Sequence, residues 1–228
     1  MTIYRLFAEP VFPDPEEADP DGLLAVGGDL SPERLVTAYA QGIFPWYSAG
    51  SPILWWSPDP RMCLVPRELH VPGSLRRVLN AGRFAFSLDT AFPRVIRACA
   101  AAPRPGQDGT WIVPEMIAAY ERLHVLGFAH SMEAWRDGEL VGGVYGVALG
   151  RVFFGESMFH SAPDASKAAF VRLVRWLDAR GCELIDCQQA TAHLRRFGAR
   201  ERSRRDFIKR VAALRSPARQ GKWTLEEH

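Results

Sequence analysis

A run of three predicted strands constrains the fold of this chain more than any other feature of the sequence. The three segments are largely apolar, and the residues between them form typical turn sequences, of which Asp-Gly is a strong hairpin signal. Tight turns of this kind join antiparallel strands, so the sequence predicts an antiparallel meander. The strands are predicted at 130–135, 140–149 and 152–159, and the turns at Asp137-Gly138 and Gly150-Arg151.

A helix and one more strand are predicted after the meander. Asp164 can cap this helix, and Gly181 ends it before the strand-like segment 184–187. A strand, a helix and a second strand in one sheet make a crossover connection. We therefore predict a mixed sheet with one crossover and a cleft at the strand ends. A further helix is predicted near Ser203, whose spacing to Asp206 resembles a capping box.

The first 60 residues follow a different pattern. Ser31 is a good N-cap for a helix that Gly42 ends. Aromatic residues then stand among prolines in segments 43–47 and 54–61, which favours extended or turn backbone over helix. This change of pattern predicts a domain boundary. We place a small N-terminal domain at residues 1–60 and a larger C-terminal domain at residues 61–228.

Positive charge is concentrated in one part of the chain. The formal net charge is only +2, but residues 195 to 210 carry a run of basic residues against Glu201 and Asp206. Such a run favours a polyanionic partner, although Arg-rich helix faces are also commonly just solvated. A smaller basic group is a candidate to extend the same surface. The run is Arg195, Arg196, Arg200, Arg202, Arg204, Arg205, Lys209 and Arg210, and the smaller group is Arg76, Arg77 and Arg83.

The composition argues against several other classes of protein. Hydrophobic residues make up 47% and charged residues 24% of the 228 residues, which is ordinary for a globular protein. The four cysteines form no C-x-x-C pair and no zinc-type spacing with histidine, so no metal site is predicted. The N-terminal region contains no long apolar stretch, so we predict neither a signal peptide nor a membrane span, and we expect a cytoplasmic protein.

Short motifs in order between Gly22 and Leu214 resemble those of the bacterial leucyl/phenylalanyl-tRNA protein transferases. So many separate strings make a chance resemblance implausible. His160 and Phe197 depart from the family pattern, and the segment after Leu214 matches it poorly. The motifs are GLLAVGGDLS at 22–31, GIFPW at 42–46, WWSPDPR at 55–61, GTWI at 109–112, LVGG at 140–143, FGESMF at 154–159 and LIDCQ at 184–188.

The resemblance implies an α+β fold, in which a small N-terminal α/β domain packs on a C-terminal acyl-CoA N-acyltransferase-like domain with a mixed sheet. The family transfers Leu or Phe, sometimes Met, from aminoacyl-tRNA to the α-amino group of proteins with N-terminal Arg or Lys, which marks them for N-end-rule degradation. The implied partners are Leu-tRNA, Phe-tRNA and these acceptor proteins, and a monomer is expected. No cofactor is expected, because an aminoacyl ester is already activated toward an amine.

Three polar residues are implied by the resemblance to carry the chemistry. Asp186 and Gln188 match the catalytic pair of the family, and Glu156 is expected near the amino group of the acceptor. A carboxylate that orients the amine and receives its proton suits the reaction, because an α-amino group titrates near pH 8. Asp186 ends an apolar segment, where a carboxylate is costly unless it is partnered or faces a cleft. The alternative is a strand-end hydrogen bond between Asp186 and Gln188 that only stabilises a turn.

Aromatic residues and one methionine are candidates for binding the donor side chain and the terminal adenine. Aromatic rings stack on bases, and Met adapts to both Leu and Phe, although any of these residues can instead belong to the core. The predicted substrate-binding residues are Tyr39, Trp46, Trp111, Tyr120, Phe153 and Met158. The predicted tRNA-binding residues are Arg76, Arg77, Arg83, Arg204 and Arg205.

Three other functions are kept as alternatives. An acyl-CoA-dependent N-acyltransferase would share the fold, but its Gly-rich pyrophosphate loop is missing before Asp164. A tRNA-binding module would use the basic run but would leave the polar set around Asp186 without a purpose. A related aminoacyltransferase that takes acidic N-termini is the third. Gly142, Gly143 and Gly146 are predicted to mark close backbone packing or a bulge rather than a phosphate loop.

Overall fold

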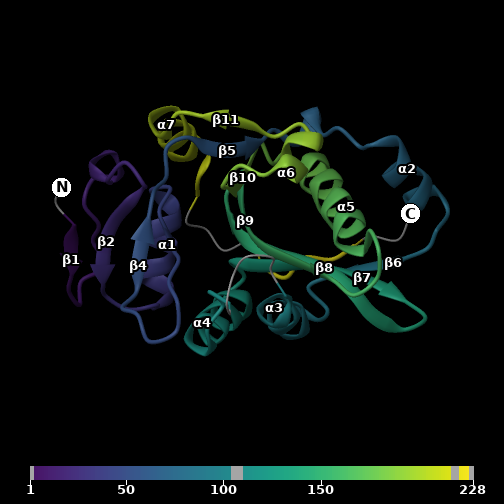
Figure 1. Ribbon diagram of the computed structural model, residues 1–228, viewed down its shortest axis with the longest axis horizontal. Helices are drawn as coiled ribbons and strands as arrows, with labels where there is room; N and C mark the ends of the chain where they lie inside the picture. The colour runs from purple at the N-terminus through teal and green to yellow at the C-terminus, as the bar shows by residue number, and fades with distance from the viewer. Residues whose placement is uncertain (1–2, 104–109, 217–220, 226–228) are drawn as a thin grey trace.

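Two β-sheets with helices around them make up the chain, as the computed structural model shows for residues 3–103, 110–216 and 221–225 (Figure 1). Gly109 of the GTWI motif therefore lies outside the described residues. The first sheet has the order β1-β2-β4-β3, with β1 parallel to β2 and the other pairs antiparallel. Its elements are β1 (Tyr4–Leu6), the 3-10 turn η1 (Pro15–Glu17), β2 (Leu23–Gly27), α1 (Pro32–Ala40), β3 (Phe44–Pro45) and β4 (Leu54–Trp56).

The second sheet has seven strands in the order β11-β5-β10-β9-β8-β7-β6. β7, β8 and β9 form the predicted antiparallel meander, and α5 leads from β9 to β10, which pair in parallel. The sheet is therefore mixed, with the predicted crossover. The elements are β5 (Arg61–Leu64), η2 (Pro66–Glu68), α2 (Gly73–Asn80), β6 (Ala85–Leu88), α3 (Phe92–Ala101), α4 (Pro114–Val125), β7 (Ala129–Arg136), β8 (Glu139–Leu149), β9 (Val152–His160), α5 (Ala165–Ala179), β10 (Leu184–Gln188), α6 (Ala192–Arg196), β11 (Arg200–Arg202) and α7 (Arg204–Leu214).

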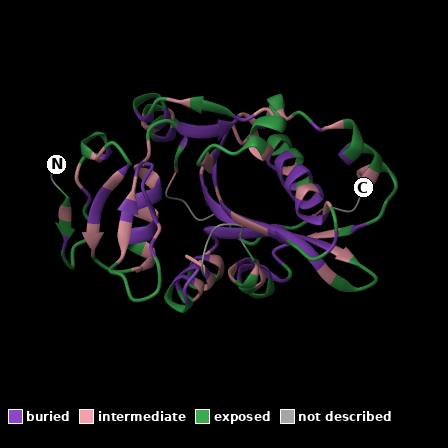
Figure 2. Cartoon of the chain, viewed as in Figure 1, coloured by how far each residue is buried: buried purple, intermediate pink, exposed green. Residues whose placement is uncertain are grey.

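Helices cover both faces of the seven-stranded sheet. α5 lies on one face, and α3 and α4 lie on the other (Figure 1). Figure 2 shows that β8 and the first half of β9 are buried almost throughout. This double cover explains why these segments are nearly continuous apolar runs instead of alternating apolar and polar residues.

The apolar core continues from the second sheet into the first. One cluster of buried side chains lies on the α5 side of the larger sheet. A second cluster contains Leu24 and Trp55 of the first sheet together with Phe154 of the second. The sheets change between Trp56 and Arg61, at the predicted boundary. Because one cluster joins them, the division into domains 1–60 and 61–228 stays a prediction.

Two of the three predicted N-cap side chains cap their helices. Ser31 Oγ accepts a hydrogen bond from the backbone N of Arg34, and Ser203 Oγ accepts one from the backbone N of Asp206, as predicted. The prediction for Asp164 was wrong. It stands at the N-cap position of α5, but its backbone is left-handed and its side chain pairs with Lys167 Nζ at 2.8 Å instead of capping the helix.

Candidate active site

The neighbouring strands β9 and β10 stop pairing before either of them ends. Their parallel register stops at Phe154 and Asp186, although β9 continues to His160 and β10 to Gln188. Each strand also has a bulge in its antiparallel pairing near this point. The polar side chains of the two strands therefore meet where the strands are no longer hydrogen-bonded to each other, as expected for a cleft at strand ends.

The two bulges position Glu156 and Gln188. On β8, Tyr145 and Gly146 are consecutive, but they pair with Ser157 and Gly155, so Glu156 is the extra residue of β9. On β10 the register shifts between Asp186 and Gln188, and Gln188 has a left-handed φ of 58°. Residues two apart lie on the same side of an extended strand, but Gln188 is not extended, so this alternation does not place it relative to Asp186.

The predicted catalytic residues are nevertheless brought together. Gln188 Nε2 donates a hydrogen bond to Glu156 Oε1 at 2.9 Å, and the Gln188 backbone N donates one to Asp186 Oδ1 at 2.8 Å. Tyr39 Oη donates to Glu156 Oε1 at 2.7 Å, and Tyr120 Oη donates to Glu156 Oε2 at 3.1 Å. Glu156 thus lies at the centre of a hydrogen-bonded group that draws residues from α1, α4, β9 and β10.

Burial changes the acidity of Glu156. Only 8% of this residue is exposed, and loss of solvation raises the pKa of its carboxyl to about 7. The negative charge of Asp186 raises this pKa further, whereas the hydrogen bonds from Tyr39 and Tyr120 oppose the change. A carboxyl group with this pKa exchanges a proton readily at neutral pH.

Asp186 has a different environment, because it is ion-paired with Arg61. Arg61 Nε donates to Oδ1 at 2.8 Å and Nη2 donates to Oδ2 at 2.6 Å, and both side chains are fully buried. The guanidinium also donates to the carbonyl of Gly42 at 3.0 Å and lies 4.8 Å and 4.5 Å from the ring centres of Phe44 and Phe207. Both oxygens of Asp186 are therefore already engaged.

Arg61 was not predicted from the sequence as a functional residue. It is the last residue of the WWSPDPR motif and the first of β5, whose four residues are all buried. An arginine that opens a fully buried strand needs a buried anion or carbonyl partner, which is the signal that was available.

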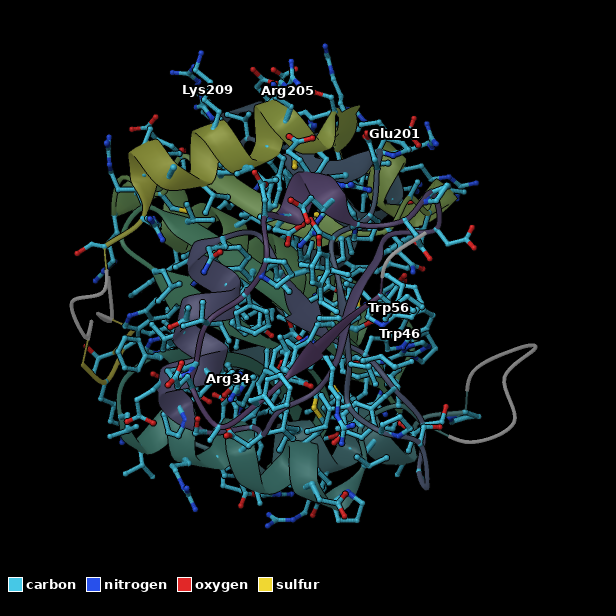
Figure 3. All side chains as sticks on the ribbon, turned by 90° about the vertical axis from the view of Figure 1, so that its left-hand side faces the viewer. Arg34, Trp46, Trp56, Glu201, Arg205 and Lys209 are labelled. Carbon is cyan, nitrogen blue, oxygen red and sulfur yellow. The ribbon has the colours of Figure 1, made fainter. Side chains whose placement is uncertain are left out.

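The predicted substrate-binding residues belong to two cavities and one hydrogen-bonded group. Phe153 and Met158 line a mostly apolar cavity of about 350 Å³ that Glu156 and Asp186 also border, together with Val144, Phe170 and Ile185. Trp46 and Trp111 line a larger cavity of about 650 Å³. The ring centres of Trp46 and Trp56 are 5.6 Å apart, and both residues are labelled in Figure 3.

Tyr39 and Tyr120 need a correction. Both are fully buried, their hydroxyls contact each other, and both hydroxyls donate to the carboxylate of Glu156. They hold this carboxylate and do not form a surface on which a base or a side chain can stack. Burial raises the pKa of each phenol well above its ordinary value, so both stay protonated donors.

The basic residues also divide into two kinds. Arg76, Arg77, Arg83 and Arg205 are exposed, and Figure 3 shows Arg205 and Lys209 projecting outward from α7. Arg204 is buried, and the prediction that it binds tRNA was wrong. Its guanidinium donates to the backbone carbonyls of Pro15, Glu16, Ala18 and Asp19, which ties the start of α7 to the N-terminal segment.

The described residues contain neither a candidate metal site nor a candidate membrane-spanning helix. In the ranges 3–103, 110–216 and 221–225, the His, Cys, Asp and Glu side chains form no group of three that could hold a metal ion. No helix in these ranges combines the length and the apolar composition that crossing a membrane requires.

Comparison with known proteins gives strong sequence matches. Residues 63–212 match the family model described as leucyl/phenylalanyl-tRNA protein transferase, and residues 28–59 match the model of the N-terminal domain of that family. A curated protein of Anaeromyxobacter dehalogenans named leucyl/phenylalanyl-tRNA–protein transferase is 64% identical over 99% of this chain and 97% of its own length. One of the same name from Nitratidesulfovibrio vulgaris is 62% identical over 95% of this chain and 93% of its own length.

Comparison with solved structures gives much weaker likeness. The C-terminal domain of a putative lysylphosphatidylglycerol synthetase from Agrobacterium fabrum is 12% identical, with a TM-score of 0.46, over 86% of this chain and 73% of that chain. A GCN5-related N-acetyltransferase from Kribbella flavida is 14% identical, with a TM-score of 0.40, over 78% of this chain and 63% of that chain.

Proposed function

This chain belongs to the leucyl/phenylalanyl-tRNA protein transferase family, and from this premise we propose that it transfers Leu or Phe, and sometimes Met, from aminoacyl-tRNA to the α-amino group of proteins that begin with Arg or Lys. Transfer to such N-termini marks the acceptor for degradation by the N-end rule. The observation that carries the proposal is the meeting of Glu156, Gln188 and Asp186 beside an apolar cavity. A cytoplasmic monomer with an N-acyltransferase-like larger domain stays a prediction.

Glu156 is the group that receives the proton of the attacking amine. In the reaction the amine nitrogen bonds to the ester carbonyl carbon, and its proton passes to the carboxylate of Glu156. The bond to the ribose oxygen then breaks, and the carboxyl returns the proton to this oxygen, so that the tRNA leaves with a free hydroxyl. A base with a pKa near 7 is matched to an amine that titrates near pH 8. The side chain of Gln188 holds the carboxylate of Glu156 in place. Asp186 positions Gln188, because its carboxylate accepts a hydrogen bond from the Gln188 backbone N.

The two cavities supply the sites for the donor. The 350 Å³ cavity beside Glu156 is apolar where Val144, Phe170 and Ile185 line it, which suits the side chain of Leu or Phe. The 650 Å³ cavity has Trp46 and Trp111 in its wall, which suits the terminal adenine, because indole rings stack on bases.

A direct assay tests the proposed function. Purified protein is incubated with Leu-tRNA or Phe-tRNA labelled in the amino acid, and with peptides that begin with Arg, Lys, Asp or Ala. We expect label on the Arg and Lys peptides without added ATP or CoA and in the presence of a chelator. Transfer from acetyl-CoA alone would indicate an N-acyltransferase instead. Binding of tRNA without any transfer would indicate a tRNA-binding module, and transfer to the Asp peptide alone would indicate a different acceptor class.

The exposed basic residues predict a salt effect. Two double variants test these residues: Arg76→Gln with Arg77→Gln on α2, and Arg205→Gln with Lys209→Gln on α7. Each is expected to weaken binding of Leu-tRNA and Phe-tRNA alike, because side chains that bind phosphate do not distinguish the amino acid. The plot of log Kd against log salt should become shallower by about one unit for each phosphate that the variant no longer neutralises.

The control for this measurement is Arg97→Gln on α3. Arg97 is 58% exposed in its side chain and pairs with Glu121 on α4, on the other side of the sheet from α5. Its replacement should leave the salt slope unchanged. If the slope of log Kd against log salt is unchanged in both double variants, these residues of α2 and α7 do not bind tRNA phosphates.

A further inference from the structure

The C-terminal residues 221–225 contact the core although they lie beyond the residues that the family model matches. Trp223 is only 5% exposed and belongs to the same apolar cluster as Phe153 and Ile185. Its ring stacks on His130 with a centroid distance of 3.6 Å and an interplanar angle of 2°, and lies 4.5 Å from the ring centre of Trp176. This tail is therefore a packed part of the fold.

Hydrogen bonds also fix the position of the tail. The backbone N of Trp223 donates to Asp89 Oδ2 at 2.9 Å, and the same carboxylate oxygen lies 2.7 Å from His130 Nδ1. Asp89 Oδ1 accepts from the backbone N of Ser131 at 2.9 Å. A buried carboxylate that orients both the stacked imidazole and the tail backbone specifies one position for the indole ring.

Phe153 connects Trp223 to the cavity beside Glu156. The ring centres of Phe153 and Trp223 are 6.1 Å apart, and Phe153 lines the 350 Å³ cavity. Gly146 limits the ring from another direction, because a Cβ placed on Gly146 would lie 2.6 Å from Phe153 Cζ. Phe153 is thus confined between the strand backbone and the indole, so the position of this cavity wall depends on Trp223.

We propose that Trp223 sets the size of the donor side-chain pocket by holding Phe153, and so determines the preference between Leu and Phe. The inference rests on the proposed function. Removing the indole leaves space into which the Phe153 ring can turn, and the pocket becomes deeper. Pocket size differences of about one methylene change discrimination by roughly tenfold. Trp223→Ala is therefore expected to raise the ratio of Phe transfer to Leu transfer by roughly tenfold, with unchanged affinity for tRNA.

The experiment is a competition. Wild type and variants receive equal amounts of Leu-tRNA and Phe-tRNA with an Arg-starting peptide in excess, and the two products are measured in a single turnover. Trp223→Phe keeps an aromatic ring at this position, so its ratio of Phe product to Leu product should stay close to that of wild type. Leu225→Ala is the matched control, because it removes an apolar side chain from the same tail, and it should leave the ratio unchanged.

A double variant with Phe153 distinguishes an effect of Trp223 on the pocket from a purely structural effect on the fold. Phe153→Ala should itself change the ratio, and adding Trp223→Ala to it should change the ratio little more, because the effect passes through the missing ring. An unchanged ratio in a folded Trp223→Ala protein, or an equal loss of both products, would overturn the inference. If that variant does not fold, Trp223→Leu takes its place with the same criteria. Failure of wild type to transfer either amino acid would instead overturn the proposed function, and the inference with it.

Discussion

The Glu156→Gln variant is expected to transfer Leu more slowly by a factor of roughly 10² to 10⁴ while it remains folded. Gln has nearly the shape of Glu, so its carbonyl oxygen can still accept the hydrogen bonds from Tyr39 and Gln188. Its amide can donate to the Tyr120 hydroxyl, which is able to act as an acceptor. The variant lacks only the ability to take up a proton. Single-turnover transfer from Leu-tRNA to an Arg-starting peptide measures the loss.

The pH dependence of the same variant gives an independent test. Because the folded state raises the pKa of Glu156 to about 7, it binds this proton more tightly than the unfolded chain does. The carboxyl therefore contributes stability at low pH that is lost as the pH rises from the unfolded pKa through about 7. Gln has no such dependence, so the unfolding free energy of the variant relative to wild type should increase between pH 5 and pH 8. The rise of the wild-type transfer rate up to about pH 7 should disappear as well.

A buried carboxylate elsewhere in the same sheet provides the control. Glu133 on β7 is fully buried, its pKa is raised mainly by burial, and it accepts hydrogen bonds from Ser87, Thr90 and Ser131. Glu133→Gln should leave the transfer rate and its pH profile close to wild type. A well-folded Glu156→Gln protein with near-normal transfer would contradict the assignment of Glu156 as proton acceptor.

Much of the fold could be predicted because its determinants are local. The Asp137-Gly138 turn between two apolar runs defined the β7–β8 hairpin, and Ser31 and Ser203 defined helix starts by their own side chains. Gly142 and Gly146 mark close packing, as predicted: a Cβ on Gly142 would lie 2.6 Å from Ala165 Cβ. Each of these signals acts within a few residues or on one neighbouring backbone.

The details of the site could not be predicted, because they depend on partners far away in the sequence. The bulge at Glu156 exists only relative to the register of β8, and the left-handed conformation of Gln188 depends on the shift of β10 against β5. Arg204 belongs to a basic run, and nothing local distinguishes it from Arg205. It is buried because carbonyl groups of the N-terminal segment, about 190 residues earlier, accept its hydrogen bonds.

The buried pair of Arg61 and Asp186 leads to the largest expected change in stability. Asp186→Asn leaves the guanidinium without its counter-charge in a fully buried position. Arg61→Met leaves the carboxylate with the Gln188 backbone N as its one remaining hydrogen-bond donor among the described residues. Removing one partner of a buried ion pair typically costs about 3–5 kcal/mol. Each single variant should therefore show a large decrease in the free energy of unfolding, measured by denaturant titration at neutral pH.

The double variant Arg61→Met with Asp186→Asn is expected to be more stable than either single variant. It removes both charges together, and the remaining Asn oxygen can still accept the hydrogen bond from the Gln188 backbone N. The double-mutant cycle then gives the coupling energy of the pair, separate from the loss of packing. Transfer by the double variant distinguishes positioning from proton uptake: because Asp186 acts by holding Gln188, activity should recover together with stability. Recovered stability with transfer still absent would mean that the charge of Asp186 itself takes part in the reaction.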